Sequence, residues 1–206
     1  RSGLWFEFAR VIDELEPQWI VIENVAGLLS SNTGRDFYTI ISWLAKRGYG
    51  ICWRVLNSEY FGVAQHRRRV YIVGSFGNGR AAKVLFENQN NQPPERIADA
   101  RFRIVRTHNL MDKRKGKAGV WVSEIFGALA TQNTRDGGNQ ADYIQYKNTI
   151  RRVTPLEYER LQNFPDNWTN GQSDSIRYKQ IGNAVTVSVA KWIANRIKEQ
   201  IKNKGE

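Results

Sequence analysis

The stretch Trp19-Ile20-Val21-Ile22-Glu23-Asn24-Val25 decides the fold, because it joins a wholly apolar run to a carboxylate and an amide. Four consecutive apolar residues are typical of a strand that is buried on both faces of an α/β sheet. A carboxylate at the end of such a strand is held rigidly, as an acid that serves a site must be. Glu23 could also simply mark the point where the strand reaches solvent, since charged residues are mostly exposed.

Helices and strands alternate around this stretch. Apolar residues recur at helical spacing over residues 4–15, and Pro17 ends that helix. A second helix is predicted over residues 37–44, with Gly48 as its C-cap, and further strands over 51–55 and 70–73. This alternation of helices and strands predicts an α/β fold in which helices cover a sheet.

The composition favours a folded chain with a polyanionic partner. The 206 residues are 41% hydrophobic and include seven tryptophans, enough for a core. No apolar run is long enough for a membrane span, no signal-peptide pattern is evident, and one cysteine excludes an intramolecular disulfide. No Cys/His spacing or carboxylate cluster suggests a metal. The net charge of +11 favours nucleic acid first and an anionic membrane second, although it could only serve solubility.

The middle of the chain differs from both ends. Residues 80–117 hold ten Lys/Arg against four Asp/Glu, a net +6, and residues 76–147 lose helical periodicity. We expect a small, irregular, β-rich domain there, between residues 1–75 and a return to the first domain over residues 148–206. Thr154, Pro155 and Glu157 form a capping box at the return, and a closing helix is predicted from about Ala184 to Ile201.

Two further motifs have the chemistry of binding sites. In an extended segment, Gln65, Arg67 and Arg69 point the same way, opposite His66 and Arg68. Two forked guanidiniums beside an amide suit phosphate oxygens and the acceptor edge of a base, although they could be only a charged lead-in to a strand. The pair Gly182-Asn183 stands just before the closing helix, where backbone groups can face a ligand at a helix N-terminus, or could form only a turn and a cap.

Five blocks occur in a characteristic order along the chain. They are Arg1-Ser2-Gly3-Leu4-Trp5-Phe6, Glu23-Asn24-Val25, Gln65-x-Arg67-x-Arg69, Arg160-Leu161-Gln162-x-Phe164-Pro165-Asp166 and Gln180-x-Gly182-Asn183-x-Val185. In this order the chain resembles the C5-cytosine DNA methyltransferases of bacterial restriction-modification systems. The resemblance implies part of a Rossmann-like methyltransferase sheet, with residues 76–147 as the target recognition domain. It also implies a cytoplasmic, nucleoid-associated bacterial enzyme that acts on duplex DNA.

The resemblance implies a role for individual residues. Such enzymes transfer a methyl group from S-adenosylmethionine to a flipped-out cytosine, after a cysteine thiolate adds to C6 of the ring. Glu23 matches the acid that bonds N3, and Asn24 a residue that holds the backbone beside it. Arg69 matches the arginine at the cytosine O2, with Arg67 and Gln65 as its supporting neighbours. The family positions that line the cofactor site correspond to Leu4, Asn183 and Val185.

The chain departs from the family pattern in small and large ways. Ala64, Asn163 and Ala184 stand where proline, glycine and serine are common, and an asparagine can keep the glycine's turn. The family's glycine-rich cofactor turn and its Pro-Cys nucleophile are not in this sequence. Cys52 lies in an ordinary strand pattern and is interpreted as a small core residue. We expect this portion alone to be inactive, and to need the amino-terminal portion of the same enzyme or a complementary subunit.

Several alternatives stay open at the level of sequence. A non-catalytic DNA-binding relative would keep the recognition domain, but it would not need an N3 acid. A relative that acts on RNA is a third possibility, although the insert of about seventy residues favours duplex DNA. Contacts to base edges are expected from four residues of the insert, which are Arg103, Arg106, Arg135 and Asn139. Phosphate contacts are expected from the lysines at 113, 115 and 117.

Overall fold

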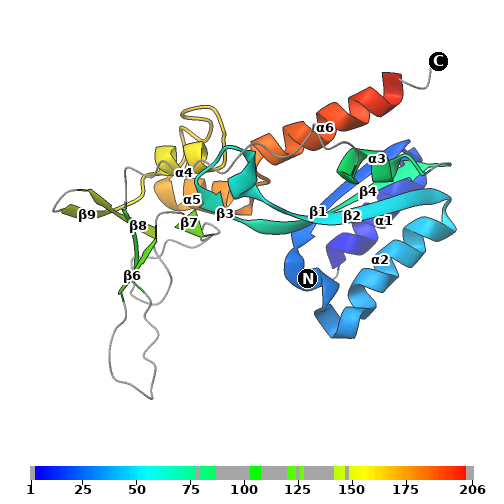
Figure 1. The fold of residues 1–206 in the computed structure, drawn as a ribbon, viewed down its shortest axis with the longest axis horizontal. Helices are drawn as coiled ribbons and strands as arrows, with labels where there is room; N and C mark the ends of the chain where they lie inside the picture. Colours follow the sequence, from blue (N-terminus) through cyan, green and yellow to red (C-terminus); the bar gives the residue numbers. More distant parts are fainter. Residues whose placement is uncertain are drawn as a thin grey trace. The chain divides into compact units, whose positions relative to one another are not determined.

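The computed structural model describes residues 3–77, 79–86, 103–107, 120–123, 126–127, 142–146 and 149–202. The chain divides into two compact units, each built from segments that are separate in the sequence (Figure 1). The first unit comprises Arg1–Val55, Arg69–Asn91 and Ile193–Glu206, and the second comprises Leu56–Arg68 and Gln92–Trp192. The functional division expected at residues 76 and 147 stays a prediction.

A three-stranded sheet organises the first unit. Its strands are β1 (Trp19–Val25), β2 (Tyr49–Asn57) and β4 (Arg68–Phe76), in the order β1-β4-β2. Strands β1 and β4 were predicted from their apolar runs and β2 from alternation, but Val21 of β1 is 44% exposed, so β1 is not buried on both faces as expected. Strand β4 runs antiparallel to β1, so that Glu23 lies opposite Tyr71 and Val25 lies opposite Arg69. The register therefore brings the acid of the first motif and the last arginine of the second motif to the same end of the strand pair.

Helix α2 (Arg35–Lys46) packs in one core with this sheet. Helix α1 (Gly3–Leu15) adds Ile12 to that core, but the other apolar residues of its predicted stripe, Leu4, Phe8, Val11 and Leu15, are exposed. Ile12 of α1, Ile40 and Leu44 of α2, and Val70 and Ile72 of β4 are all buried there. Gly48 follows α2 with a φ of +84°, the left-handed conformation that glycine adopts most easily. Both helices and the glycine stop were predicted. Two 3-10 turns, η1 (Ala26–Leu29) and η2 (Ser31–Gly34), connect β1 to α2.

A short helix, α3 (Ala81–Phe86), corrects the expectation that helical structure stops at residue 76. It packs in the first unit, with Val84 and Leu85 buried. The buried side chain of Arg196 donates to the main-chain oxygens of Val84 and Lys83, so a cation closes the carboxyl end of this helix. Helix α3 could not be predicted from the sequence, because six residues are too few for a periodic pattern and because Arg196, which stabilises it, is distant in the sequence.

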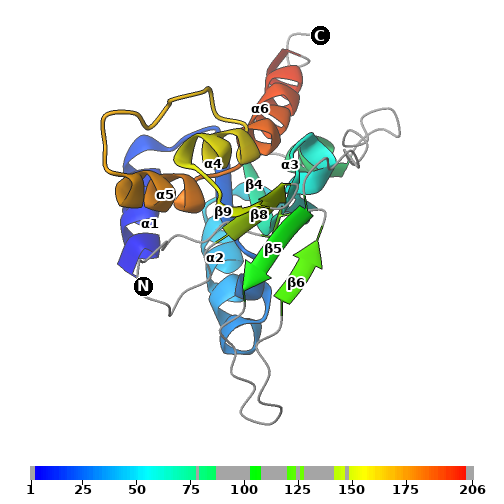
Figure 2. The same cartoon turned by 90° about the vertical axis from the view of Figure 1, so that its left-hand side faces the viewer.

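The second unit contains the expected short strands. Four of them form an antiparallel sheet in the order β6-β5-β8-β9 (Figure 2). Their bounds are Arg103–Thr107 for β5, Val120–Ser123 for β6, Asp142–Tyr146 for β8 and Thr149–Arg152 for β9. Strand β3 (Gln65–His66) pairs in parallel with β7 (Phe126–Gly127), next to the 3-10 turn η3 (Ser58–Phe61). The prediction of a small β-rich region in addition to the α/β sheet is therefore confirmed.

Helices α4 (Pro155–Leu161) and α5 (Asp174–Asn183) pack in the second unit around Tyr158, Tyr178 and Ile181. The predicted capping box is present, because Thr154 accepts from the backbone of Glu157 and the Glu157 carboxylate accepts in return. The closing helix α6 (Val187–Lys202) begins three residues later than predicted. None of the helices in the described part of the chain is long and apolar enough to cross a membrane.

Gly182 and Asn183 were expected just before the closing helix, and that placement is wrong. They form the last turn of α5, and an extended link separates them from α6. Their backbone groups therefore belong to a helix C-terminus, which attracts cations, rather than to a helix N-terminus, which attracts anions. The sequence pattern was misleading because the apolar residues of α5 are few and are separated by polar ones; they are Ile176, Tyr178 and Ile181.

Candidate functional site

Glu23 is held within the sheet instead of emerging freely into solvent. Its side chain is 21% exposed, and its Oε1 lies 3.1 Å from Nε of Arg69, whose side chain is 16% exposed. The ion pair crosses the two antiparallel strands diagonally, since Arg69 is opposite Val25. Asn24 stabilises the same strand end, because its Oδ1 accepts from the backbone N–H of Val25 at 2.8 Å. The carboxylate and the arginine predicted to meet one base are therefore neighbours.

The other two members of the arginine motif point into the second unit. Gln65 and Arg67 are buried, whereas His66 and Arg68 are exposed, so the predicted alternation is present. The Arg67 guanidinium donates to the main-chain oxygens of Gly182 at 3.2 Å and of Ala184 at 3.0 Å. A guanidinium that faces carbonyls inside the fold does not present itself to a phosphate, which corrects the direct contact expected for Arg67. It suits a supporting role instead.

Gln65 is enclosed completely, and neither polar atom of its side chain has a hydrogen-bond partner among the described residues. A buried amide without partners costs on the order of 1–3 kcal/mol, so its presence needs a reason. The contact expected between Gln65 and DNA stays a prediction.

A buried chain of hydrogen bonds between hydroxyl and amide groups stabilises the same segment that Arg67 contacts. Ser58 bonds Thr186 at 2.8 Å, Thr186 donates to Gln162 at 2.7 Å, and Gln162 donates to the carbonyl of Ile181 at 3.2 Å. Gln162 belongs to a motif quoted above, but no sequence signal indicated Ser58 or Thr186. Together with Arg67, this chain fixes the end of α5, where the predicted cofactor residue Asn183 lies, and the link to α6, which contains Val185.

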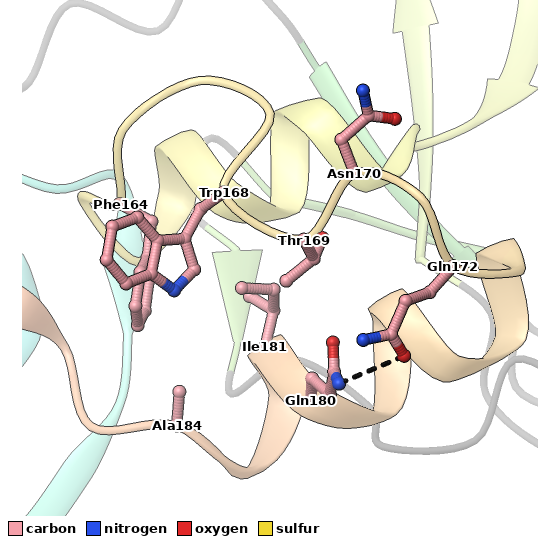
Figure 3. Close-up of a pocket in the computed structure, with 8 residues that line it drawn as sticks. All are labelled: Phe164, Trp168, Thr169, Asn170, Gln172, Gln180, Ile181 and Ala184. Carbon is pink, nitrogen blue, oxygen red and sulfur yellow. Dashed lines mark hydrogen bonds between the residues drawn. The ribbon is translucent and has the colours of Figure 1, made fainter.

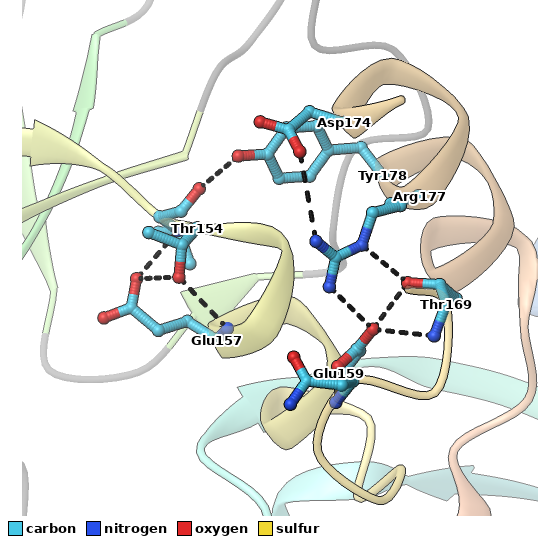
Figure 4. A network of polar contacts seen from close by, with 9 residues as sticks. Thr154, Glu157, Glu159, Thr169, Asp174, Arg177 and Tyr178 are labelled. Carbon is cyan, nitrogen blue, oxygen red and sulfur yellow. Dashed lines mark hydrogen bonds and ion pairs between the residues drawn. The ribbon is translucent and has the colours of Figure 1, made fainter. Parts of the chain in front are cut away.

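A second polar network fixes the loop between α4 and α5 (Figure 4). The carboxylate of Glu159 is fully enclosed and accepts from the backbone of Asn167 at 2.7 Å, from the backbone and hydroxyl of Thr169, and from Arg177 at 3.1 Å. Burial alone would raise the pKa of Glu159, but the hydrogen bonds from Thr169, Arg177 and Asn167 outweigh it and hold that pKa below its usual value.

The loop held by Glu159 forms one side of a cavity of about 330 Å³ (Figure 3). Phe164 and Trp168 lie together on one side, with ring centroids 6.0 Å apart, and the amides of Gln172 and Gln180 are joined by a hydrogen bond of 3.2 Å on the other. The remaining lining residues are Thr169, Asn170, Ile181 and Ala184. All eight are uncharged, and Ala184 lies between the predicted cofactor residues. The cavity therefore suits an uncharged, partly aromatic group.

Cys52 does not have the surroundings of a nucleophile. It lies half-buried in the middle of β2, and burial raises the pKa of its thiol. A raised pKa keeps the sulfur protonated near neutral pH, whereas a reactive cysteine needs the thiolate. This agrees with its interpretation as a small core residue.

The remaining predicted site residues are distributed along the chain. Leu4 lies on α1 in the first unit with 81% of its surface exposed. Arg103 and Arg106 both belong to strand β5. Arg135, Asn139 and the lysines at 113, 115 and 117 lie outside the described residues. Their roles stay predictions.

Comparison with known proteins decides the family. The family model described as C-5 cytosine-specific DNA methylase matches residues 1–115 and 83–199, which together cover nearly the whole chain. The chain belongs to this family. The methylase is 30% identical to the type II methyltransferase M1.ScrFI of Lactococcus lactis subsp. cremoris, over 97% of this chain and 56% of that protein. It is 29% identical to M.NlaX of Neisseria lactamica, over 96% of this chain and 68% of that protein.

Solved structures agree on the fold of the methylase. The Dnmt2 methyltransferase of S. pombe matches with a TM-score of 0.63 and 18% identity, over 98% of this chain and 71% of that structure. The methyltransferase EhMeth of Entamoeba histolytica matches with a TM-score of 0.60 and 18% identity, over 90% of this chain and 63% of that structure. The predicted methyltransferase fold is confirmed. The chain spans about half the length of the first curated relatives it matches.

Proposed function

We propose that this methylase chain supplies the base-activating and DNA-reading portion of an enzyme that methylates C5 of cytosine in duplex DNA. Type II methyltransferases among its bacterial relatives support a role in restriction-modification, in the cytoplasm where the DNA lies. The net charge of +11 suits a polyanionic substrate. Bound S-adenosylmethionine would supply the methyl group.

The ion pair of Glu23 and Arg69 is the observation that carries this proposal. A cytosine ring becomes open to addition at C6 when a carboxylic acid donates a hydrogen bond to N3. A guanidinium nearby can donate to the O2 atom beside N3. The two side chains lie 3.1 Å apart on paired strands, so a single base can reach both. Asn24 keeps the strand end in place through its contact with the backbone of Val25.

The base has to leave the duplex to reach this pair, because N3 of a cytosine inside the duplex is already hydrogen-bonded to the paired guanine. Extrusion costs a few kcal/mol, which polar contacts in the pocket offset. Arg67 acts as a positioning residue, since it holds the carbonyls of Gly182 and Ala184 and so keeps the α5–α6 link in shape.

Residues at the end of α5 and in that link would hold part of the cofactor. Asn183 offers an exposed amide, Val185 is partly buried, and Ala184 between them lines the uncharged cavity of about 330 Å³. An amide and an apolar surface fit the neutral portion of S-adenosylmethionine.

The test measures transfer of labelled methyl groups from S-adenosylmethionine to duplex DNA. The protein is completed with the segment that carries the Pro-Cys nucleophile, and the Glu23→Gln variant is compared with wild type. We expect at least a hundred-fold loss of rate, since general acid catalysis contributes about 10²–10⁴-fold. Glu199→Gln, an exposed change on α6, is the matched control and should retain full activity.

Equal labelling of DNA by wild type and Glu23→Gln would reject the role of Glu23. DNA binding without any transfer in the completed wild-type protein would instead favour a non-catalytic DNA-binding relative. Transfer to RNA but not to duplex DNA would favour the third possibility, an enzyme that acts on RNA.

A further inference from the structure

A histidine and a buried carboxylate form a contact outside the predicted catalytic group. His66 of β3 has 53% of its side chain exposed, and its Nδ1 lies 3.3 Å from Oε1 of Glu59, whose side chain is only 8% exposed. Nδ2 of Asn57 is 3.0 Å from the same ring nitrogen and also bonds the Glu59 carboxylate. All three residues belong to the second unit.

These contacts fix how the imidazole is oriented. Only the NH₂ end of Asn57 can donate to a carboxylate, so the bond to Glu59 assigns its amide nitrogen. When the His66 ring is neutral, Nδ2 of Asn57 donates to Nδ1 of His66, and the proton of the ring is on Nε2. In the protonated ring Nδ1 donates to Glu59 and Nε2 keeps its own proton. The outer nitrogen is therefore a hydrogen-bond donor in both states.

The neighbouring charges make the outer face of this segment a cationic one. Arg68 is the next outward residue along the segment and is exposed, whereas Arg67 is turned inward. Strand β7, which pairs with β3, contributes Phe126 and Gly127, neither of which can ionise. Glu59 is thus the acidic group that faces His66 in the described part of the second unit, and it faces only the inner nitrogen.

We propose that His66 donates from Nε2 to a backbone phosphate of duplex DNA, with Asn57 and Glu59 as the residues that position its ring. The inference rests on the proposed function for its ligand, and it assigns a phosphate contact to a face opposite that of Gln65 and Arg67. A phosphate binds an imidazolium more strongly than a neutral imidazole, and histidine changes its charge between pH 5 and 8. DNA therefore binds more tightly at pH 6 than at pH 8.

The test uses the full chain and a fluorescent 30-base-pair duplex, because a phosphate contact does not depend on the recognition sequence. Anisotropy gives the dissociation constant as a function of salt at pH 6 and pH 8. At pH 6, the His66→Gln variant should bind roughly 3- to 10-fold more weakly, with a salt slope lower by about one unit, as for the loss of one phosphate contact. At pH 8 the dissociation constants of His66→Gln and wild type should differ less than at pH 6.

Three variants separate the proposed contact from other causes. Arg68→Gln removes a neighbouring cation that stays charged at both pH values, so its loss of affinity should be the same at pH 6 and pH 8. Glu59→Gln should reduce the difference in dissociation constant between pH 6 and pH 8 towards that of His66→Gln. Circular dichroism verifies that this buried substitution leaves the fold intact. His108→Gln removes the only other histidine of the sequence and should keep the wild-type pH difference.

The outcomes distinguish this inference from the proposed function. If wild type binds DNA with a salt-dependent affinity but His66→Gln has the same slope and pH response, the inference is overturned. It is also overturned if the pH difference disappears in His108→Gln instead. If wild type shows no salt-dependent binding at either pH, the DNA substrate of the proposed function fails, and the phosphate contact fails with it.

Discussion

Arg69 holds the carboxylate of Glu23 across two antiparallel strands, with Nε and Oε1 3.1 Å apart and both side chains mostly enclosed. Removing the arginine leaves a partly buried charge without its nearest cation. We expect Arg69→Gln to lower the free energy of unfolding by about 1–3 kcal/mol, as measured by urea denaturation. Arg68→Gln, at the exposed neighbouring position, should cost less than about 1 kcal/mol. Equal costs for the two variants would show that the ion pair contributes nothing.

Replacing Glu159 by glutamine should destabilise the second unit strongly. The buried carboxylate bonds three donor residues, and the neutral amide cannot accept from all of them, so we expect a loss of about 3 kcal/mol in the free energy of unfolding. Asp166→Asn breaks an exposed ion pair with Arg160 instead and should change stability little. A small effect of Glu159→Gln would mean that water can replace the carboxylate.

The same residue predicts how stability depends on pH. The pKa of Glu159 in the folded protein lies below its value in the unfolded chain, so the folded state binds fewer protons. The stability contributed by Glu159 is therefore fully present above that unfolded value and is lost as the pH falls through the lower folded value. Urea titrations between pH 6 and pH 3 should show a steeper loss in wild type than in Glu159→Gln. Parallel curves would contradict the lowered pKa.

Much of the first unit could be predicted from the sequence, because local patterns determine it. Apolar runs located the strands around Ile22 and Ile72, and Gly48 marked the end of α2. The pattern could not show that Arg67 bonds the carbonyls of Gly182 and Ala184, since no local signal connects residues so distant in sequence. The roles of Glu23 and Arg69 came from motif resemblance, and their proximity required the strand register.

The capping box of α4 should contribute more than the corresponding position of α5. Thr154 accepts a hydrogen bond from the backbone of Glu157, whereas Ser173 occupies the N-cap position of α5 without a side-chain cap bond. Thr154→Ala should therefore lower the unfolding free energy by about 1 kcal/mol. Ser173→Ala is the matched control, with a smaller effect in the same thermal or urea unfolding assay. Equal effects would indicate that helix propensity, not capping, determines both.

Asn163 occupies a left-handed turn with a φ of +60°. Glycine adopts this conformation without strain, and alanine pays about 1 kcal/mol for its Cβ. We expect Asn163→Gly to change the melting temperature little and Asn163→Ala to lower it by several degrees. Asn170→Ala, at an ordinary backbone conformation in the same loop region, is the control. An Asn163→Ala variant as stable as wild type would exclude a strained turn.

The hydrogen bonds from Arg67 to the carbonyls of Gly182 and Ala184 have a consequence for how the methylase chain can tolerate changes in its middle region. Two chain segments more than a hundred residues apart are fastened inside one unit, and the insert expected to recognise DNA lies between them. The entropy of closing a flexible loop grows slowly, by about 0.6 kcal/mol for each doubling of its length. We therefore expect inserts of different lengths to be tolerated there, while the hydrogen bonds of Arg67 and the ion pair of Glu23 and Arg69 stay unchanged.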